Sequence, residues 1–303
     1  AMPPPLGGRR RSPGRTAGFS SRSTGSGADP GGRDRPKGRA LSLLASLDPA
    51  HVFSGFGVGV LVGMTGVGGG SLMTPLLVLL FGIHPVTAVG TDLLFAAMTK
   101  TVGMMVHGVN RTVDWTVTGL LALGSVPVTV ATLLVLAQME KNGGSGHLVA
   151  TAMGWALLVT SLMLLFRRRL LAFAARHHSG EISRSTRTTA TVVTGAVLGL
   201  VVSISSVGAG AIGMTALLIL YPALPIPRLV GSDIAHAVPL TLVAGMGYWW
   251  IGSVDLGLLG QLLTGSVPGI LIGSLLAPRT PEAILKPLLA GVLALVGVKL
   301  VLA

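Results

Sequence analysis

A lysine stands well inside an apolar stretch of the sequence. Asp92, Lys100 and His107 follow one another in a segment of mostly apolar residues and glycines. A charged side chain at mid-depth of a membrane costs at least about 2.5 kcal/mol on insertion scales, so an embedded cation is by default a functional candidate. We therefore expect Lys100 to bind an anionic substrate. The alternative is that Lys100 pairs with an aspartate of another helix and only stabilises the fold.

Two aspartates occupy matching places in the two halves of the chain. Asp92 follows a Gly-Thr pair, and Asp233 follows a Gly-Ser pair 141 residues later. A carboxyl beside an anion site couples protons to transport when it is protonated with substrate and deprotonated without it. We expect Asp92 and Asp233 to act in this way, with His236 passing the proton on. The alternatives are helix N-capping by the aspartates and a merely hydrogen-bonded His236.

Glycine-rich stretches interrupt two apolar segments, near residues 63–75 and 203–210. Irregular backbone at membrane depth is tolerated only where protein or a water-filled cavity satisfies it. A helix that restarts there presents free N–H groups and a partial positive charge, which attract anions. The expected substrate-binding residues are Gly68, Gly69, Gly70, Ser71, Lys100, Ser205, Ser206, Gly208 and Gly210. Close helix packing is the other use of glycine, and we expect it at Gly55, Gly59, Gly63, Gly195 and Gly199.

The composition shows what must position these residues. Half of the 303 residues are hydrophobic and 11% are charged, whereas about a quarter are charged in soluble domains. Eight apolar segments, long enough to cross a core of about 30 Å, cover residues 51–82, 86–108, 115–138, 148–166, 190–221, 229–251, 256–277 and 282–302. The chain has no cysteine, which excludes disulfides and thiolate metal sites. No metal or cofactor is expected.

The second half of the chain repeats motifs of the first. Val67-Gly68-x-Gly70 recurs as Val207-Gly208-x-Gly210, and the Gly-Ser-Val-Pro of residues 124–127 recurs at 265–268. The predicted fold is an all-α polytopic membrane protein with two homologous four-segment repeats, whose first helices are broken by glycine. Such duplication is typical of secondary transporters, with the substrate site where the copies meet. The predicted division is a disordered basic tail (1–47), a first repeat (48–166), a basic linker (167–189) and a second repeat (190–303).

Basic residues indicate orientation. Residues 1–47 hold nine Arg or Lys, and residues 167–187 hold six Arg. The positive-inside rule places both regions in the cytoplasm, which requires an even number of crossings between them, and four single crossings satisfy this. In the alternative, residues 51–82 and 190–221 each dip into the membrane and return, so the repeats are inverted and the basic linker lies outside. We favour four crossings, and we expect the basic residues to meet lipid rather than nucleic acid.

The runs GMTGVGGGSLMTPLL and AVGTDLLFAAMTKTVGMMVHG, followed by TVDW, resemble the sulfite exporter TauE/SafE family of membrane permeases. SSVGAGAIGMTALL, VGSDIAHAVPL and GSVDLG resemble its second repeat, and the resemblance covers about residues 50–303. It implies secondary transport, and export in particular, of small sulfur-containing anions such as sulfite or sulfonates across the cell membrane. The alternatives are an intramembrane enzyme, although no H-E-x-x-H or G-x-S-x-G motif occurs, and a membrane assembly subunit without a substrate.

Overall fold

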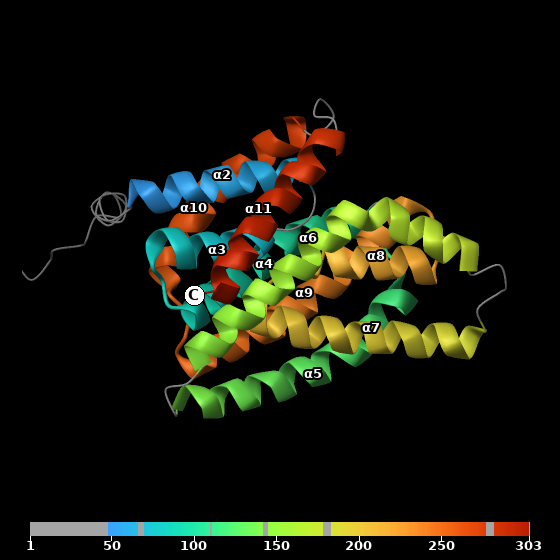
Figure 1. Ribbon diagram of the computed structural model, residues 1–303, viewed down its shortest axis with the longest axis horizontal. Coiled ribbons are helices and arrows are strands. Elements are labelled where there is room, and N and C mark those ends of the chain that lie inside the picture. Colours follow the sequence, from blue (N-terminus) through green and yellow to red (C-terminus); the bar gives the residue numbers. More distant parts are fainter. Residues whose placement is uncertain are drawn as a thin grey trace, which may run out of the picture. The chain divides into compact units, whose positions relative to one another are not determined.

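The computed structural model describes residues 48–65, 70–109, 111–141, 145–177, 183–276 and 282–302 (Figure 1). All of them belong to one compact unit, Leu47–Ala303. Every regular element in these ranges is a helix, which confirms the predicted all-α class. The helices are α2 (Pro49–Thr65), α3 (Gly70–Phe81), α4 (Pro85–Val109), α5 (Trp115–Lys141), α6 (Ser145–His177), α7 (Arg184–Ser205), α8 (Ala211–Leu220), α9 (Ile226–Ile251), α10 (Leu256–Leu276) and α11 (Glu282–Leu302).

Six stretches of these helices are long and apolar enough to cross a membrane: Pro85–Val109, Trp115–Lys141, Gly146–Phe166, Arg184–Ser205, Ile226–Ile251 and Leu256–Gly273. The protein is therefore a multi-pass membrane protein. The predicted segments 86–108, 115–138, 229–251, 256–277 and 282–302 match single helices within a few residues. Helix α6 continues past the predicted segment 148–166 as far as His177, so the first part of the basic linker is helical.

The second apolar segment with glycines is broken where the sequence predicts. Helix α7 ends at Ser205, and Ser206 turns the chain with a left-handed backbone, at φ 57°. Gly208 follows at φ 104°, a conformation that glycine adopts without the steric cost of a side chain. Helix α8 then begins at Ala211. In the first half, α2 ends at Thr65 and α3 begins at Gly70, and residues 66–69 lie outside the described part of the chain.

Each broken segment is a hairpin whose end lies beside its beginning. The ring of His51, at the start of α2, is 4.5 Å from the ring of Phe81 at the end of α3. In the second half, Thr191 Oγ1 is hydrogen-bonded at 2.8 Å to the hydroxyl of Tyr221, which follows α8. The Arg187 guanidinium also lies over the Tyr221 ring. Each segment therefore returns toward its beginning, which favours the inverted-repeat alternative; the number of membrane crossings stays a prediction.

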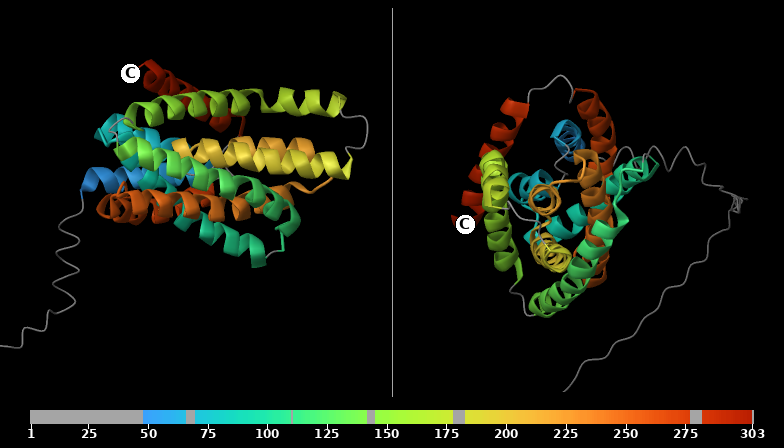
Figure 2. Two further views of the ribbon diagram at one scale, coloured as in Figure 1. Left: turned by 90° about the horizontal axis from the view of Figure 1, so that it is seen from below. Right: turned by 90° about the vertical axis from the view of Figure 1, so that its right-hand side faces the viewer.

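The hairpins place the start of α2 and the start of α7 at opposite ends of the helices. At one end, called the His84 end, the start of α6 at Gly146 packs on the His84 ring. At the other, called the Tyr221 end, Asp114 and Arg187 line one pocket with Tyr221. Helix α2 begins at the His84 end, whereas α6 ends and α7 begins at the Tyr221 end (Figures 1 and 2). Residues 1–47 lie outside the described part of the chain, and the cytoplasmic placement of the two basic regions stays a prediction.

Glycines bring two pairs of helices into backbone contact. A Cβ at Gly59 of α2 would fall 2.5 Å from the Ser266 carbonyl oxygen of α10, and one at Gly199 of α7 would fall 2.5 Å from that of Ser125 in α5. Equivalent backbone contacts are made at Gly55 and Gly195. The predicted packing role of these four glycines is confirmed.

Two further contacts match across the halves. Asp114 N donates to Ser232 Oγ at 2.8 Å, and Asp255 N donates to Thr91 Oγ1 at 3.1 Å. In each case the start of a helix in one half is held by a hydroxyl from the other half. Gene-level duplication stays a prediction from the sequence, and the matched contacts support it.

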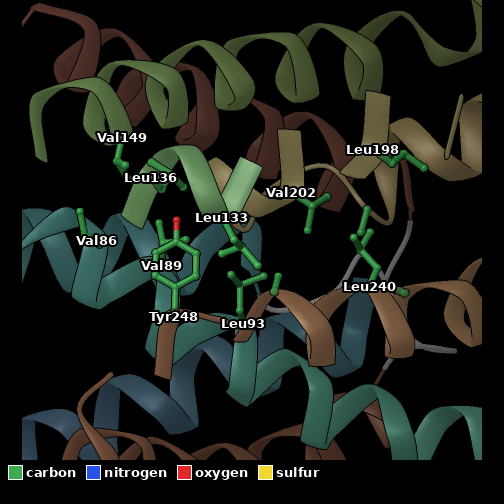
Figure 3. Packing of buried hydrophobic residues seen from close by; sticks show 13 residues of the cluster. Val86, Val89, Leu93, Leu133, Leu136, Val149, Leu198, Val202, Leu240 and Tyr248 are labelled. Carbon is green, nitrogen blue, oxygen red and sulfur yellow. The ribbon is translucent and has the colours of Figure 1, made fainter. Parts of the chain in front are cut away.

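The core lies where α4, α5, α7 and α9 meet (Figure 3). Leu93, Leu133, Val202 and Leu240 pack there with Tyr248, whose ring is fully buried. The Tyr248 hydroxyl donates to the Ser203 carbonyl at 2.8 Å. This hydrogen bond satisfies a carbonyl in the last turn of α7, because helix ends leave their final carbonyls without helical partners.

Single cysteines in this cysteine-free chain test the hairpin arrangement. We expect Asp48→Cys and Lys141→Cys to be labelled from one side of intact cells, and Ser183→Cys and Ala223→Cys from the other. The Tyr221 end, with Arg111, Arg184, Arg187 and Arg228, should be cytoplasmic by the positive-inside rule. Labelling of positions 48 and 183 from the same side would restore the four-crossing arrangement.

Candidate functional site

Asp92 lies in the interior of α4, seven residues after its first residue, and is fully buried. The interpretation of Asp92 as a helix N-cap is therefore wrong. Thr74 of α3 donates its hydroxyl hydrogen to Asp92 Oδ2 at 2.5 Å. The Ser206 side chain from the α7–α8 break lies near the same carboxyl. Asp92 Oδ1 nevertheless has no hydrogen-bond partner among the described residues.

Asp233 occupies the matching place in α9, again seven residues after the first residue of its helix, so it is not an N-cap either. Its carboxyl packs against α8, where Gly213 leaves the room: a Cβ at that glycine would collide with Asp233 Oδ1. This oxygen has no hydrogen-bond partner in the described ranges. The two aspartates thus differ, because a threonine supports Asp92 and only a glycine backbone faces Asp233.

Lys100 lies on α4, about two turns beyond Asp92, and is partly buried. Its ammonium interacts electrostatically with Asp233 and, more weakly, with Asp92. Among the described residues it forms no salt bridge, within 4.0 Å, with either carboxylate. The structure therefore brings the predicted cation and both predicted carboxyls together, but it does not show Lys100 locked in a direct ion pair.

His236 is buried one turn after Asp233 on α9. Its Nε2 is hydrogen-bonded at 2.9 Å to Ser125 Oγ of α5. This contact agrees with the alternative in which His236 is simply a hydrogen-bonded polar group. Its position next to the Asp233 turn also leaves a proton-transfer role open.

The serines and glycines of the α7–α8 break have separate roles. Ser205 Oγ donates to the Val201 carbonyl at 2.6 Å and accepts from Val207 N at 3.2 Å, so it stabilises the turn. Ser206 Oγ is buried without a partner in the described part of the chain. Gly210 precedes α8 and supplies no side-chain cap, while Gly208 accepts from the amide of Ile212. The Ile212 amide is thus satisfied, whereas no side chain caps the other amides of the first turn of α8.

The predicted site residues of the first break are only partly described. Gly68 and Gly69 lie outside the described residues. Gly70 is the first residue of α3, and Ser71 follows it in the same helix. Their proposed contact with substrate stays a prediction.

Tertiary structure adds two residues that sequence analysis missed, Thr74 and Ser125. Thr74 stands within the glycine-rich run, but only the fold places its hydroxyl against Asp92. Ser125 belongs to a repeated motif, yet its match Ser266 has no hydrogen-bond partner among the described residues. The carboxylates Asp114 and Asp255, in contrast, are helix caps: Asp114 accepts from the amides of Thr116 and Val117, and Asp255 accepts from the amide of Leu258.

The arrangement has the parts of an ion-binding site inside a bundle. Two buried carboxyls, an unpaired lysine, an imidazole and an uncapped helix N-terminus lie around one break in the backbone. An uncapped N-terminus and an ammonium suit an anion. Carboxyl groups that titrate nearby can couple that anion to protons.

Comparison with known proteins finds one family and several relatives. The family described as "Sulfite exporter TauE/SafE" matches residues 51–300. A "Probable membrane transporter protein YjnA" of Bacillus subtilis (strain 168) is 34% identical over 251 residues, which cover 82% of this chain and 98% of the relative. A second, YdhB of the same organism, is 28% identical over 79% of this chain and 97% of the relative.

A more distant relative comes from an archaeon. The "Probable membrane transporter protein MJ0441" of Methanocaldococcus jannaschii is 23% identical over 65% of this chain and 70% of its own length. No solved structure matches the chain significantly. The family match spans nearly all of the described helices, and with it the aspartates, the lysine and both broken segments. The chain therefore belongs to the sulfite exporter TauE/SafE family of membrane transporters.

Proposed function

We propose that the protein is a secondary transporter that exports small sulfur-containing anions, such as sulfite or organosulfonates, across the cell membrane. The observation that carries this proposal is the uncapped N-terminus of α8 beside Asp233 and Lys100. The family supports the substrate class, and the names of the relatives support transport. An enzyme or an assembly subunit would give no reason for this convergence of charged groups on a backbone break.

The proposed anion site is built from the α8 end of the break. Gly213, in the first turn of α8, contacts the Asp233 carboxyl, which is in turn the charge that interacts most strongly with Lys100. The Lys100 ammonium and the α8 amides therefore act on the same region. An oxyanion there would meet backbone donors and one full positive charge.

Asp233 is the proposed proton coupler, with Asp92 as the other candidate from the sequence. An ionised Asp233 competes with substrate for Lys100 and for the positive end of α8. Protonation of Asp233 removes this competing charge and leaves both groups to the anion. Among the described residues, Asp233 Oδ1 accepts no hydrogen bond, and Lys100 is the cation with which this carboxyl interacts. His236 lies one turn away and can pass the proton on.

The hairpins give this site access to both sides. In inverted-repeat transporters the substrate lies near the bilayer midplane, between helix hairpins that rock against the rest of the bundle. Here the α7–α8 hairpin reaches into the protein from the Tyr221 end and the α2–α3 hairpin from the His84 end. We propose that movement of these hairpins exposes the anion alternately to the two sides.

The transport proposal predicts anion flux through the protein alone. Purified protein in liposomes should move at least one of sulfite, thiosulfate, sulfoacetate, taurine or a short carboxylate faster than empty vesicles do. Flux of radiolabelled compound is the measurement. Failure with the whole panel, in vesicles that hold folded protein, would contradict the proposed substrate class.

Lys100 is predicted to supply substrate affinity. Lys100→Ala should raise the half-saturating substrate concentration by roughly tenfold or more, the equivalent of about 1.4 kcal/mol. Lys100→Arg should retain part of the affinity, because the charge remains. Lys299→Ala, near the end of α11, is the control and should transport normally. A Lys100→Ala protein that transports normally and melts earlier would show that Lys100 is only a structural residue.

Asp233 is predicted to couple flux to the pH gradient. Asp233→Asn should keep substrate counterflow, which needs no gradient, and lose pH-driven uptake. Asp255→Asn is a matched control, because its carboxyl caps α10; it should keep both stability and coupling, since asparagine caps a helix about as well as aspartate. Loss of both transport modes in Asp233→Asn, with an earlier melting transition, would instead assign Asp233 to the fold.

A further inference from the structure

Two buried oxygens on the α7 side of the break have no partner. They are Asp92 Oδ1 and Ser206 Oγ, and neither is hydrogen-bonded to any residue that the structure describes. Asp92 is fully buried and Ser206 is 7% exposed. The two side chains come from α4 and from the break, and the Ser206 hydroxyl lies close enough to the Asp92 carboxyl to interact with it, although outside the geometry of a hydrogen bond. Leaving a polar group buried without a partner costs about 1–3 kcal/mol, so a pair of such groups points to a missing ligand.

The surroundings determine the sign of that ligand. In the last turn of α7, the Val202 carbonyl accepts from Ser206 N and the Ser203 carbonyl accepts from Tyr248. No hydrogen bond to the carbonyls of Ile204 and Ser205 is found within the described ranges. Carbonyl oxygens at a helix C-terminus carry a partial negative charge. A carboxylate, a hydroxyl oxygen and free carbonyls together suit a hard cation.

The charge of the site favours a monovalent ion. Asp92 is the one carboxylate at this end of the break, because Asp233 lies against α8 instead. Lys100 interacts more strongly with Asp233 than with Asp92, so the charge of Asp92 is the less compensated of the two. Divalent ions are usually held by more acidic groups, and no group of three or more acidic, histidine or cysteine residues gathers in the described chain.

We propose that Asp92 Oδ1, Ser206 Oγ and the free carbonyls at the end of α7 bind a sodium ion. Thr74 is a positioning residue, because its hydroxyl holds the other carboxylate oxygen of Asp92. The break then has two poles, with the cation at the C-terminal end of α7 and the anion at the N-terminal end of α8, an arrangement known for broken helices in transporters. Ion binding does not depend on the proposed function; only its use in coupling does.

Thermal unfolding without any substrate tests the site directly. Purified protein is melted in increasing NaCl, with KCl or choline chloride keeping the ionic strength constant. A ligand that binds only the folded state stabilises it, so Na⁺ should raise the melting temperature saturably, whereas K⁺ and choline should not. Equal melting temperatures in all three salts would overturn the proposal.

Variants test whether Asp92, Ser206 and Thr74 produce the change of melting temperature with Na⁺. Ser206→Ala should raise the half-saturating Na⁺ concentration by roughly tenfold, and Asp92→Asn should abolish the response. If Asp92→Asn does not fold, Ser206→Ala and Thr74→Val carry the test, and Thr74→Val should weaken Na⁺ binding without abolishing it. Ser266→Ala is the matched control, because it removes another buried unpartnered hydroxyl and should respond as the unmodified protein does. A wild-type response in Ser206→Ala would overturn the site.

Flux measurements separate this inference from the proposed function. Na⁺ stabilisation in a protein that moves no anion would contradict the transport proposal and leave the sodium site standing. Anion flux in a protein whose melting temperature does not change with Na⁺ would support the transport proposal and contradict the sodium site.

Discussion

The structure depends on the cost of leaving backbone and side-chain polar groups unsatisfied inside a hydrocarbon layer. A continuous helix avoids that cost, because every amide and carbonyl of its interior is paired. At the break between α7 and α8, backbone groups lose their helical hydrogen-bond partners inside the bundle. Ser205 and Tyr248 satisfy some of the exposed groups. The groups that remain are those that can bind ions.

The same constraint explains why so many helices surround the break. Helices α3, α4 and α9 supply Thr74, Asp92 and Asp233, which lie next to it, and α5 supplies the serine that holds His236. These helices can approach closely because glycines remove side chains where α2 meets α10 and α5 meets α7. Without a hydrophobic driving force in lipid, such backbone contact is a main source of helix association. The packing glycines therefore hold the irregular backbone in place.

Charge is distributed unequally between the two halves. Lys100 has Thr241 as its counterpart in the second half, and Thr241 simply donates to the Ala237 carbonyl of its own helix. Asp92 has a threonine partner, whereas Asp233 faces a glycine. Paired contacts between the halves thus frame a site whose chemistry is asymmetric. Asp92 can then bind a cation, while Asp233 interacts with Lys100 and competes with the anion.

Sequence alone determined the membrane class, the helix segments, the second break and the packing glycines, because hydropathy, glycine runs and repeat spacing are local signals. It also selected Asp92, Lys100, Asp233 and His236, since charge inside an apolar segment is conspicuous. It did not determine that the aspartates lie inside helices rather than at their starts, because hydropathy does not mark where a helix begins.

Only the tertiary structure decided the path of the chain and the partners of the charges. The hairpins rest on contacts between residues thirty positions apart, His51 with Phe81 and Thr191 with Tyr221, which no local pattern encodes. The positive-inside rule could not replace them, because it concerns the charge of loops and not the path of the chain between them. The hydroxyl that supports Asp92 and the glycine that faces Asp233 come from other helices. Their distances follow from packing, which is a property of the whole fold.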